Sequence, residues 1–560
     1  MRSRTLLSLF VTLLAALALT ACGGSDSDKK SDSSGASVDL NGPASLAPAD
    51  SPLYFEATVD PNGYNATEIK DVVSKVSRGK VTDPGTEIIK ALEKSSREGS
   101  DPKPVDFAKD VEPWLGDRGG LFVSSFGELS SRATQGAGSS ELLSGGDVPK
   151  PLSSDEADFD GAFVVEVTDT AKAQAFIDKT VAKNATTKDY SGTKYKLEPD
   201  ASDTAAVGIV GDFLVFGSEA GLKKAVDTSK GSSLAENDAF KKTVAATTGK
   251  LGFGYVSSAG LKKALSANAS AGTGQAETLE AAFGQFDSIG FGVDVRSDAV
   301  SIDAVSIGGE ATSGDPGALV GEVPADAVLA AGTADIGANS KKFFDQIDKL
   351  DDTGQFRTGL DQLESIGGLS LEKDVLAWMG DGAIFVRGSS LSDVGGAIII
   401  KSKDAAKTKA TIAKLKQLTS LAAAGGESSA IQVAPIAGAQ VDDGFSVRSP
   451  QLPFPVEIAL KGDRFVIAIG NGALADSLAP KEKLSSTDAF KSAADQLVDG
   501  TELSFFLDVP KIVDAISTVA GNSPDFREAK PYLDAFGQVA GGTKRTKDGQ
   551  AQNLVIGIEK

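Results

Sequence analysis

Few side chains in this sequence are able to do covalent or metal chemistry. The 560 residues include no histidine and a single cysteine, Cys22. Without histidine, Ser-His-Asp and Cys-His catalysis is excluded, and so are zinc sites built from His and Cys. General acid–base work would fall to Asp, Glu, Lys or Tyr, whose ordinary pKa values lie far from neutrality. We therefore expect no catalytic residue, no cofactor and no metal ligand in this chain.

Two aspartates at matching places are the candidates for carboxylate chemistry. Asp117 and Asp381 each end a Trp-x-Gly-Asp step. A two-carboxylate glycosidase needs its carboxyl groups roughly 5 to 9.5 Å apart. A Gly-Asp pair more commonly turns the chain into the next strand, as we expect at Gly211-Asp212. We favour the turn, and we keep a carboxylate-dependent hydrolase as the third hypothesis for function.

Three further patterns carry weaker signals. Trp114 and Trp378 are the only tryptophans, and either could line a ligand pocket. A tryptophan in a repeated unit more often packs beneath a sheet, and we favour that reading. The segment Glu156–Gly161 faintly resembles a calcium loop but lacks the terminal bidentate Glu. The Ser-x-x-Lys spacing of Ser370–Lys373 lacks the partner motifs of penicillin-binding enzymes.

The N-terminal segment has the three parts of a secretory signal peptide. Arg2 and Arg4 give a basic start, and a mainly apolar run follows from Leu6 to Leu19. The run is short for a bilayer-spanning helix, which needs roughly 20 apolar residues. Leu19-Thr20-Ala21-Cys22 then resembles the lipobox of bacterial lipoproteins. The resemblance implies that residues 1–21 are removed and that Cys22 carries acyl chains such as palmitate.

A polar segment separates Cys22 from the rest of the chain. Residues 23–42 are mostly Gly, Ser, Asp and Lys, so residues 22–42 are expected to form the lipidated Cys and a flexible tether. The lipid would anchor the protein at the extracytoplasmic face of the cell membrane. The net charge of −21 repels nucleic acid and anionic headgroups. We therefore expect membrane attachment through the lipid on Cys22 and no nucleic-acid partner.

Beyond the tether, one sequence pattern occurs twice. The matched segments keep their order, and their spacing drifts as loop insertions require. We interpret them as an internal duplication, with halves at 43–311 and 318–560. The matches are Pro48-Ala49-Asp50 with Pro324-Ala325-Asp326, Trp114 with Trp378, Gly211-Asp212 with Gly462-Asp463, Asp238-Ala239-Phe240-Lys241 with Asp488-Ala489-Phe490-Lys491, and Ala282-Phe283-Gly284-Gln285 with Ala535-Phe536-Gly537-Gln538.

The apolar periods indicate mixed secondary structure in each half. Helical spacing predicts helices around 69–76, 173–177 and 343–350. Short apolar runs separated by turn residues predict strands, and strands joined by tight turns are antiparallel. We expect an α+β fold in which each half is a mainly antiparallel sheet with helices on one face. Ser124–Asp160 and Ala422–Ser429 are interpreted as mobile insertions. The predicted strands are 120–123, 163–167, 213–216, 289–295 and 300–305.

The lipobox, the tether, the Pro-Ala-Asp-x-x-x-Tyr strand and the Trp-x-Gly-Asp step together resemble lipoproteins carrying domain of unknown function 3352. That family occurs mainly in actinobacteria and their relatives, and the resemblance covers most of residues 43–560. It implies no activity and no site residues, because none is established for the family.

Our first hypothesis is a membrane-anchored extracytoplasmic lipoprotein with a non-enzymatic binding or scaffolding role in the cell envelope. Its partner would be an envelope protein or a hydrophobic ligand. The second hypothesis is a carrier of a lipid or other hydrophobic ligand, held in an apolar cavity beneath helices; it rests on analogy between folds.

Overall fold

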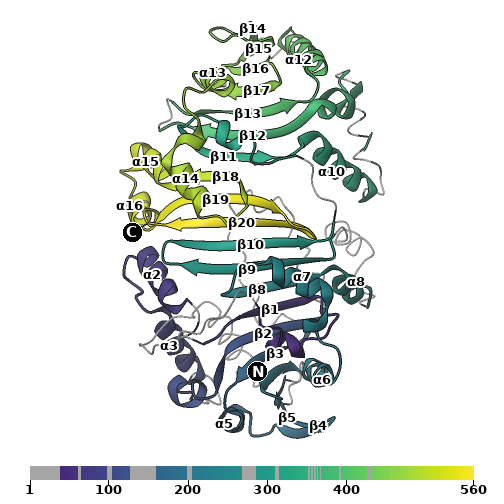
Figure 1. Cartoon of the computed structure of the whole chain (residues 1–560). Coiled ribbons are helices and arrows are strands. Elements are labelled where there is room, and N and C mark those ends of the chain that lie inside the picture. Colours follow the sequence, from purple (N-terminus) through teal and green to yellow (C-terminus); the bar gives the residue numbers. More distant parts are fainter. Residues whose placement is uncertain are drawn as a thin grey trace. The chain divides into compact units, whose positions relative to one another are not determined.

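The structure is a computed structural model of the chain, and its described residues form two compact units. Unit 1 contains the described residues within Met1–Glu310 and Thr546–Ala551, and unit 2 contains those within Ala311–Arg545 and Gln552–Lys560. Figure 1 labels the helices and strands. The described residues are 38–60, 63, 65–97, 104–126, 159–198, 205–267, 286–309, 314–350, 354, 357–358, 361, 364–365, 368–389, 393–424, 431–450 and 452–559.

Unit 1 is built on an antiparallel sheet. Each strand pairs with the next in the order below, and two-residue turns join β6 to β7 and β9 to β10. The described strands lie in the order β4 (Thr186–Tyr190), β5 (Thr193–Glu198), β6 (Ala205–Val210), β7 (Phe213–Ser218), β3 (Phe159–Val167), β2 (Leu115–Phe126), β1 (Leu53–Thr58), β8 (Gly252–Ser257), β9 (Ser288–Arg296) and β10 (Ala299–Ile307).

Unit 2 has the same strand order. If the strands are numbered within their own unit, each strand of unit 2 has the neighbours that its counterpart has in unit 1. The order in the described part of unit 2 is β14 (Gln432–Ala434), β15 (Asp443–Arg448), β16 (Val456–Lys461), β17 (Arg464–Ile469), β13 (Gly395–Ser402), β12 (Met379–Arg387), β11 (Ala327–Thr333), β18 (Glu502–Asp508), β19 (Phe536–Arg545) and β20 (Gly549–Ile558).

Helices connect the strands at corresponding places in the two units. In unit 1 they are η1 (Pro43–Leu46), α2 (Ala66–Ser77), α3 (Pro84–Arg97), the π-helix η2 (Phe107–Val111), α5 (Thr170–Thr180), α6 (Glu219–Thr228), η3 (Leu234–Glu236), α7 (Asp238–Ala246) and α8 (Ser258–Ala267). In unit 2 they are η4 (Val320–Glu322), α10 (Ile336–Leu350), the π-helix η5 (Leu371–Val375), η6 (Leu376–Trp378), α12 (Ala405–Ala424), α13 (Ala473–Leu478), η7 (Leu484–Ser486), α14 (Asp488–Asp495), α15 (Val509–Ala520) and α16 (Pro524–Leu533).

The repeated Asp-Ala-Phe-Lys segments open α7 and α14. The side chain of Asn237 caps α7 by accepting a hydrogen bond from the backbone N of Phe240 at 3.1 Å. Thr487 caps α14 in the same way, from the backbone N of Phe490 at 3.2 Å. A side-chain oxygen at this position satisfies a helix N–H that has no partner within the helix, which explains why both helices begin at this motif.

The helices and strands predicted from apolar periods are confirmed. The predicted helices lie within α2, α5 and α10, and the predicted strands lie within β2, β3, β7, β9 and β10. Gly211 and Gly462 take φ values of 59° and 62° in the β6–β7 and β16–β17 turns. Such left-handed backbone favours glycine, so the predicted Gly-Asp turns are confirmed there.

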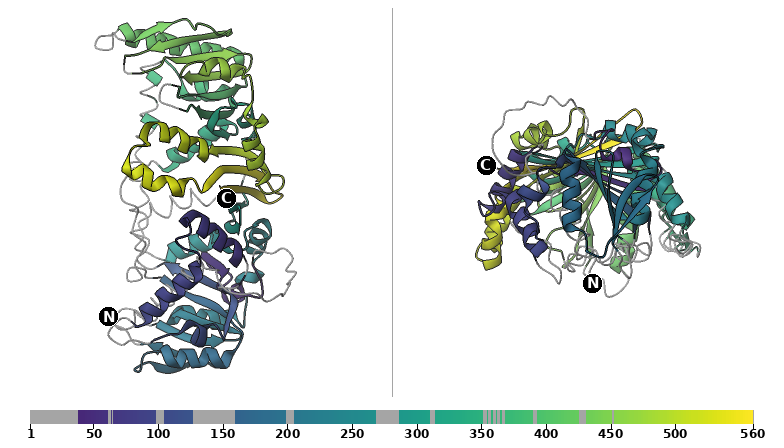
Figure 2. Two further views of the ribbon diagram at one scale, coloured as in Figure 1. Left: turned by 90° about the vertical axis from the view of Figure 1, so that its left-hand side faces the viewer. Right: turned by 90° about the horizontal axis from the view of Figure 1, so that it is seen from below.

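Unit 1 carries helices on both faces of its sheet, so the expectation of one covered face is wrong here. Successive residues of a strand point to opposite faces. Val164 and Val215 pack with residues of α6 and α7, on what we call the Tyr54 face. Val165 and Phe216 pack with residues of α5 and with Trp114, on the Trp114 face. Figures 1 and 2 show α2 and α3 on the opposite side of unit 1 from α7 and α8.

Strands covered on both faces read as continuous apolar runs, as in Phe213–Phe216. The prediction of one covered face did not use this signal. In the described part of the chain, no helix is long and apolar enough to cross a bilayer.

Candidate functional site

Several predicted features fall outside the described residues. Cys22, the signal segment 1–21 and the tether up to residue 37 are among them. So are Glu156 and Asp158 of the calcium-like segment and most of the two expected insertions. The lipid attachment on Cys22 therefore stays a prediction.

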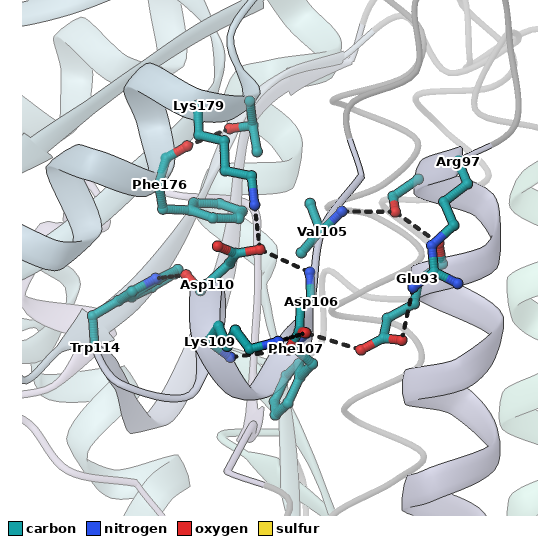
Figure 3. Close-up of polar contacts among 12 residues, drawn as sticks. Glu93, Arg97, Val105, Asp106, Phe107, Lys109, Asp110, Trp114, Phe176 and Lys179 are labelled. Carbon is teal, nitrogen blue, oxygen red and sulfur yellow. Dashed lines mark hydrogen bonds and ion pairs between the residues drawn. The ribbon is translucent and has the colours of Figure 1, made fainter.

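Trp114 is buried in a polar clasp at the start of β2 (Figure 3). Its Nε1 donates to the backbone O of Asp110 at 2.6 Å, within one turn of the π-helix η2. The Asp110 carboxylate accepts from the backbone N of Asp106 at 2.8 Å and from Lys179 Nζ of α5. Phe176 of α5 packs on the indole, with ring centroids 5.3 Å apart. The clasp thus fixes α5 on the Trp114 face.

Unit 2 contains the same clasp around Trp378, which is also buried. Trp378 Nε1 donates to the backbone O of Asp374 at 2.8 Å. The Asp374 carboxylate accepts from the backbone N of Ser370 and from Lys414 Nζ of α12, each at 2.8 Å. The Lys414 ammonium holds the pKa of Asp374 below its usual value. The surroundings of the indole differ: Trp378 Nε1 also donates to the Thr411 hydroxyl at 3.1 Å, at the helix position that Phe176 holds in unit 1, and Phe465 packs on the ring with centroids 4.9 Å apart.

Both tryptophans are therefore packing residues, as we favoured. Ser370 and Lys373, singled out for their spacing, form the first turn of η5, where the Ser370 hydroxyl caps the backbone N of Lys373. Every charged group of the clasp is engaged with a partner inside its own unit. The clasp therefore holds α5 or α12 against the sheet and leaves no group for chemistry.

Asp117 and Asp381 lie inside strands β2 and β12, so the predicted turn is wrong at these two positions. The register of β2 against β3 shifts between Leu115 and Gly119, and that of β12 against β13 shifts between Met379 and Gly382. Gly-Asp thus marks a β-bulge, which a sequence pattern does not distinguish from a turn. The Asp381 carboxylate accepts from the backbone N of Asp335 at 2.9 Å, a local structural role.

Unit 1 also holds a buried ionisable cluster that sequence reasoning missed. Glu56 on β1 accepts from Arg118 Nε of β2 at 2.8 Å and from the hydroxyl of Tyr54. Glu166 of β3 accepts from the backbone N of Arg118 at 3.0 Å. Burial raises the pKa of both Glu56 and Glu166, and Arg118 opposes that rise. Burial also raises the pKa of Tyr54 well above its usual value.

The cluster has no counterpart in unit 2. Counted from the matched motifs, Gly332 takes the place of Glu56, Gly382 that of Arg118 and Lys401 that of Glu166. Within unit 1 both Glu56 oxygens are engaged by internal partners. Among the described residues, no group of three or more His, Cys, Asp or Glu side chains is placed to hold a metal ion. Nothing in the described structure indicates catalysis.

The Trp114 face of unit 1 carries a line of apolar residues, interrupted by one glycine, which we call row 1. Cross-strand pairing sets its members side by side, since directly paired residues point to the same face. Val207 and Phe216 at one end are buried beneath α5, whereas Phe55 and Phe291 are 46% and 43% exposed. In order across the strands, row 1 is Val207, Phe216, Phe163, Leu121, Phe55, Gly254 and Phe291.

Unit 2 carries a corresponding row 2 on the face of Trp378. Ile458 and Ile467 pack against the core beneath α12, and Ile398 and Ile384 are 40% and 44% exposed. In order across the strands, row 2 is Ile458, Ile467, Ile398, Ile384, Ala331 and Phe505.

The rows are unusual because solvated sheet faces are normally polar. Along β1, β8, β9 and β10, every position on the Trp114 face is uncharged, although charged residues make up 24% of the chain. Beside row 1, the paired Val293 and Ile302 are exposed on the same face. Val386 and Ile469 are exposed beside row 2. Exposed apolar patches of this kind mark surfaces that bind a partner or ligand.

Comparison with known proteins places the chain in a family but gives no activity. A family model described as "Protein of unknown function (DUF3352)" matches residues 6–552. A solved structure titled "Structure of crystal form I of TP0453" is 11% identical, covers 49% of this chain and 81% of that chain, and gives a TM-score of 0.22. A likeness at that score carries no argument about fold or function. No curated protein matches the chain.

Proposed function

The chain belongs to the DUF3352 family, and from that premise we propose that it is a membrane-anchored extracytoplasmic lipoprotein with a non-enzymatic binding role in the cell envelope. The anchor is the lipid on Cys22, for which the Leu-Thr-Ala-Cys step and the preceding signal-like segment are the support. The acidic surface then stays in solution at the end of a polar tether.

The binding role rests on the exposed parts of row 1 and row 2. A monomeric soluble protein gains nothing from keeping Phe55, Phe291, Ile384 and Ile398 in water, because each exposed apolar Å² costs roughly 25 cal/mol relative to burial. A partner that covers the row recovers this free energy. The observation that carries the proposal is the same uncharged line of side chains on the same face of both units.

We further propose that the two units derive from an internal duplication, so that row 1 and row 2 are equivalent binding surfaces. The identical strand order supports this, as does the repeated clasp in which a Trp Nε1 meets a π-helix carbonyl and an Asp holds a Lys of the next helix. Chance seldom repeats both a ten-strand order and a set of hydrogen bonds.

A pair of surface variants tests the binding role. Phe55→Asp and Ile384→Asp place a charge in the exposed part of each row. Val519→Asp on α15 is the matched control, because Val519 is 59% exposed but lies on a helix. The double row variant combines Phe55→Asp with Ile384→Asp. We expect the native protein, isolated from its own membranes, to carry bound molecules that mass spectrometry and crosslinking identify. The double row variant should lose these molecules, and the Val519→Asp control should keep them. Recovery of the same molecules by the double row variant would contradict the proposal.

A further inference from the structure

Resting on that proposed function, we propose that the occupant of each row is a single hydrocarbon chain, the acyl chain of a monomeric fatty acid or lipid. The chemistry of the exposed surface, its length and its continuity with the core each point to this class of ligand.

The exposed part of row 1 offers no polar recognition. Its members Leu121, Phe55, Gly254 and Phe291 have no side-chain donor or acceptor. The backbone groups there are committed, because β1, β8 and β9 each pair with a strand on both sides. A protein partner normally makes about one hydrogen bond per 100–200 Å² of interface, and an added β-strand needs a free edge. A hydrocarbon chain needs neither.

The row has the length of an extended acyl chain. The exposed part of row 1, from Leu121 on β2 to Phe291 on β9, crosses four strands. At about 4.8 Å between neighbouring strands, the three intervals span about 14 Å. The acyl chains of one bilayer leaflet span about 15 Å, half of the hydrocarbon core. One full chain therefore fits along the row.

One end of each row continues into the hydrophobic core. Phe216 stacks on Phe163, with ring centroids 4.8 Å apart and planes 9° apart, beneath the helix that the Asp110–Lys179 clasp holds in place. In unit 2, Ile467 meets the core around Trp378 beneath α12. An acyl chain that lies on the exposed part of the row therefore contacts apolar side chains, and no charged group, where the row passes beneath the helix.

The source is a monomer rather than the bilayer surface. The chain carries a net charge of −21, which opposes close approach to an anionic membrane. Some 15 residues separate Cys22 from Val38, which is buried in the core of the Tyr54 face. The tether predicted for these residues would reach about 20 Å, which would keep unit 1 near the lipids that supply monomers.

Calorimetric titration of saturated fatty acids of eight to sixteen carbons into the full chain carrying Cys22→Ser tests the inference. We expect two chains bound per protein and a Kd that falls about four-fold for each added methylene, the factor that corresponds to 0.8 kcal/mol. Phe55→Asp or Ile384→Asp should each leave one chain bound, their combination none, and Val519→Asp two. Far-UV circular dichroism checks folding. Should an Asp variant unfold, Phe55→Ser and Ile384→Thr make the same comparison with a smaller change.

Each other outcome decides between the two proposals. Binding that ignores chain length, two chains on the double variant, or binding to phosphatidylcholine vesicles without binding of monomers would overturn the acyl-chain inference. If fatty acids do not bind but the double variant loses a crosslinked envelope protein, the acyl-chain inference fails and the binding function stands. If the double variant changes neither, both fail.

Discussion

The placement of Tyr54 and Phe55 on β1 makes a sharp stability prediction. Tyr54 is fully buried, packs edge-on against Phe240 with ring centroids 5.6 Å apart, and donates its hydroxyl to Glu56. Its neighbour Phe55 is 46% exposed. Truncating each to alanine should therefore give very different losses, although the two side chains are nearly the same size.

The expected magnitudes follow from burial. Tyr54→Ala removes a core ring, which costs about 3–5 kcal/mol, and leaves Glu56 without one donor, which adds about 1 kcal/mol or more. Phe55→Ala removes a ring that is about half in water and opens no closed cavity, so it should cost about 1 kcal/mol. Total stabilities of 5–15 kcal/mol are normal, so both losses are measurable.

Urea unfolding measures the difference. In a Trp378→Phe background, Trp114 is the only tryptophan, so its fluorescence reports unit 1 alone. The unfolding curve of Phe55→Ala should stay close to that of the background. The urea midpoint of Tyr54→Ala should fall, and the decrease should be several times that seen for Phe55→Ala. If Tyr54→Ala does not fold, Tyr54→Phe, which removes only the hydroxyl, should still cost about 1 kcal/mol. Equal losses at both positions would refute the assignment of faces, and with it row 1.

Three further predictions concern the anchor, the buried carboxylates and the clasp. Cys22→Ser should release the protein to the medium or leave an unprocessed precursor, as shown by fractionation and mass spectrometry; a processed variant that stays anchored would contradict the lipid attachment. The raised pKa values of Glu56 and Glu166 mean that their contribution to stability is complete below their ordinary pKa of 4.5 and is lost as the pH rises through the raised values. The free energy of unfolding of Glu56→Gln should therefore shift in favour of the variant as the pH rises from 4 to 8, and a shift in the opposite direction would count against this. Lys414→Met should raise the pKa of Asp374 toward its ordinary 3.8, as followed by NMR titration. It should lower the free energy of unfolding by at most about 1 kcal/mol, because both groups are partly exposed. Lys416→Met, on the exposed side of α12, is the control and should change neither the pKa of Asp374 nor the stability.

The sequence by itself determined the local elements and the excluded chemistry. Apolar spacing located α2, α5, α10 and the five predicted strands, because a helix or strand that must bury one face repeats its apolar residues with its own period. The paired motifs gave the two tryptophans matching positions, and the structure shows the same indole hydrogen bond at each. The absence of histidine excluded whole classes of catalytic and metal site, since composition needs no fold to be read.

The tertiary structure decided which face of each strand is buried. In Leu53-Tyr54-Phe55-Glu56, the pattern alone would bury the two wholly apolar side chains, whereas the fold buries Tyr54 and Glu56. Arg118, 62 residues away, makes that burial tolerable by pairing with Glu56, and no local pattern announces a partner at that distance. Phe55 then points to the open face.

The candidate surface likewise exists only in three dimensions. Phe216, Phe163, Phe55 and Phe291 come from four separate strands and become one row through strand order and register. A shift of one residue in any pairing would send that member to the opposite face, because side chains alternate along a strand. Strand order, register and the helices that cover one end of the row depend on contacts between distant segments, and these contacts decide where the apolar surface stays open.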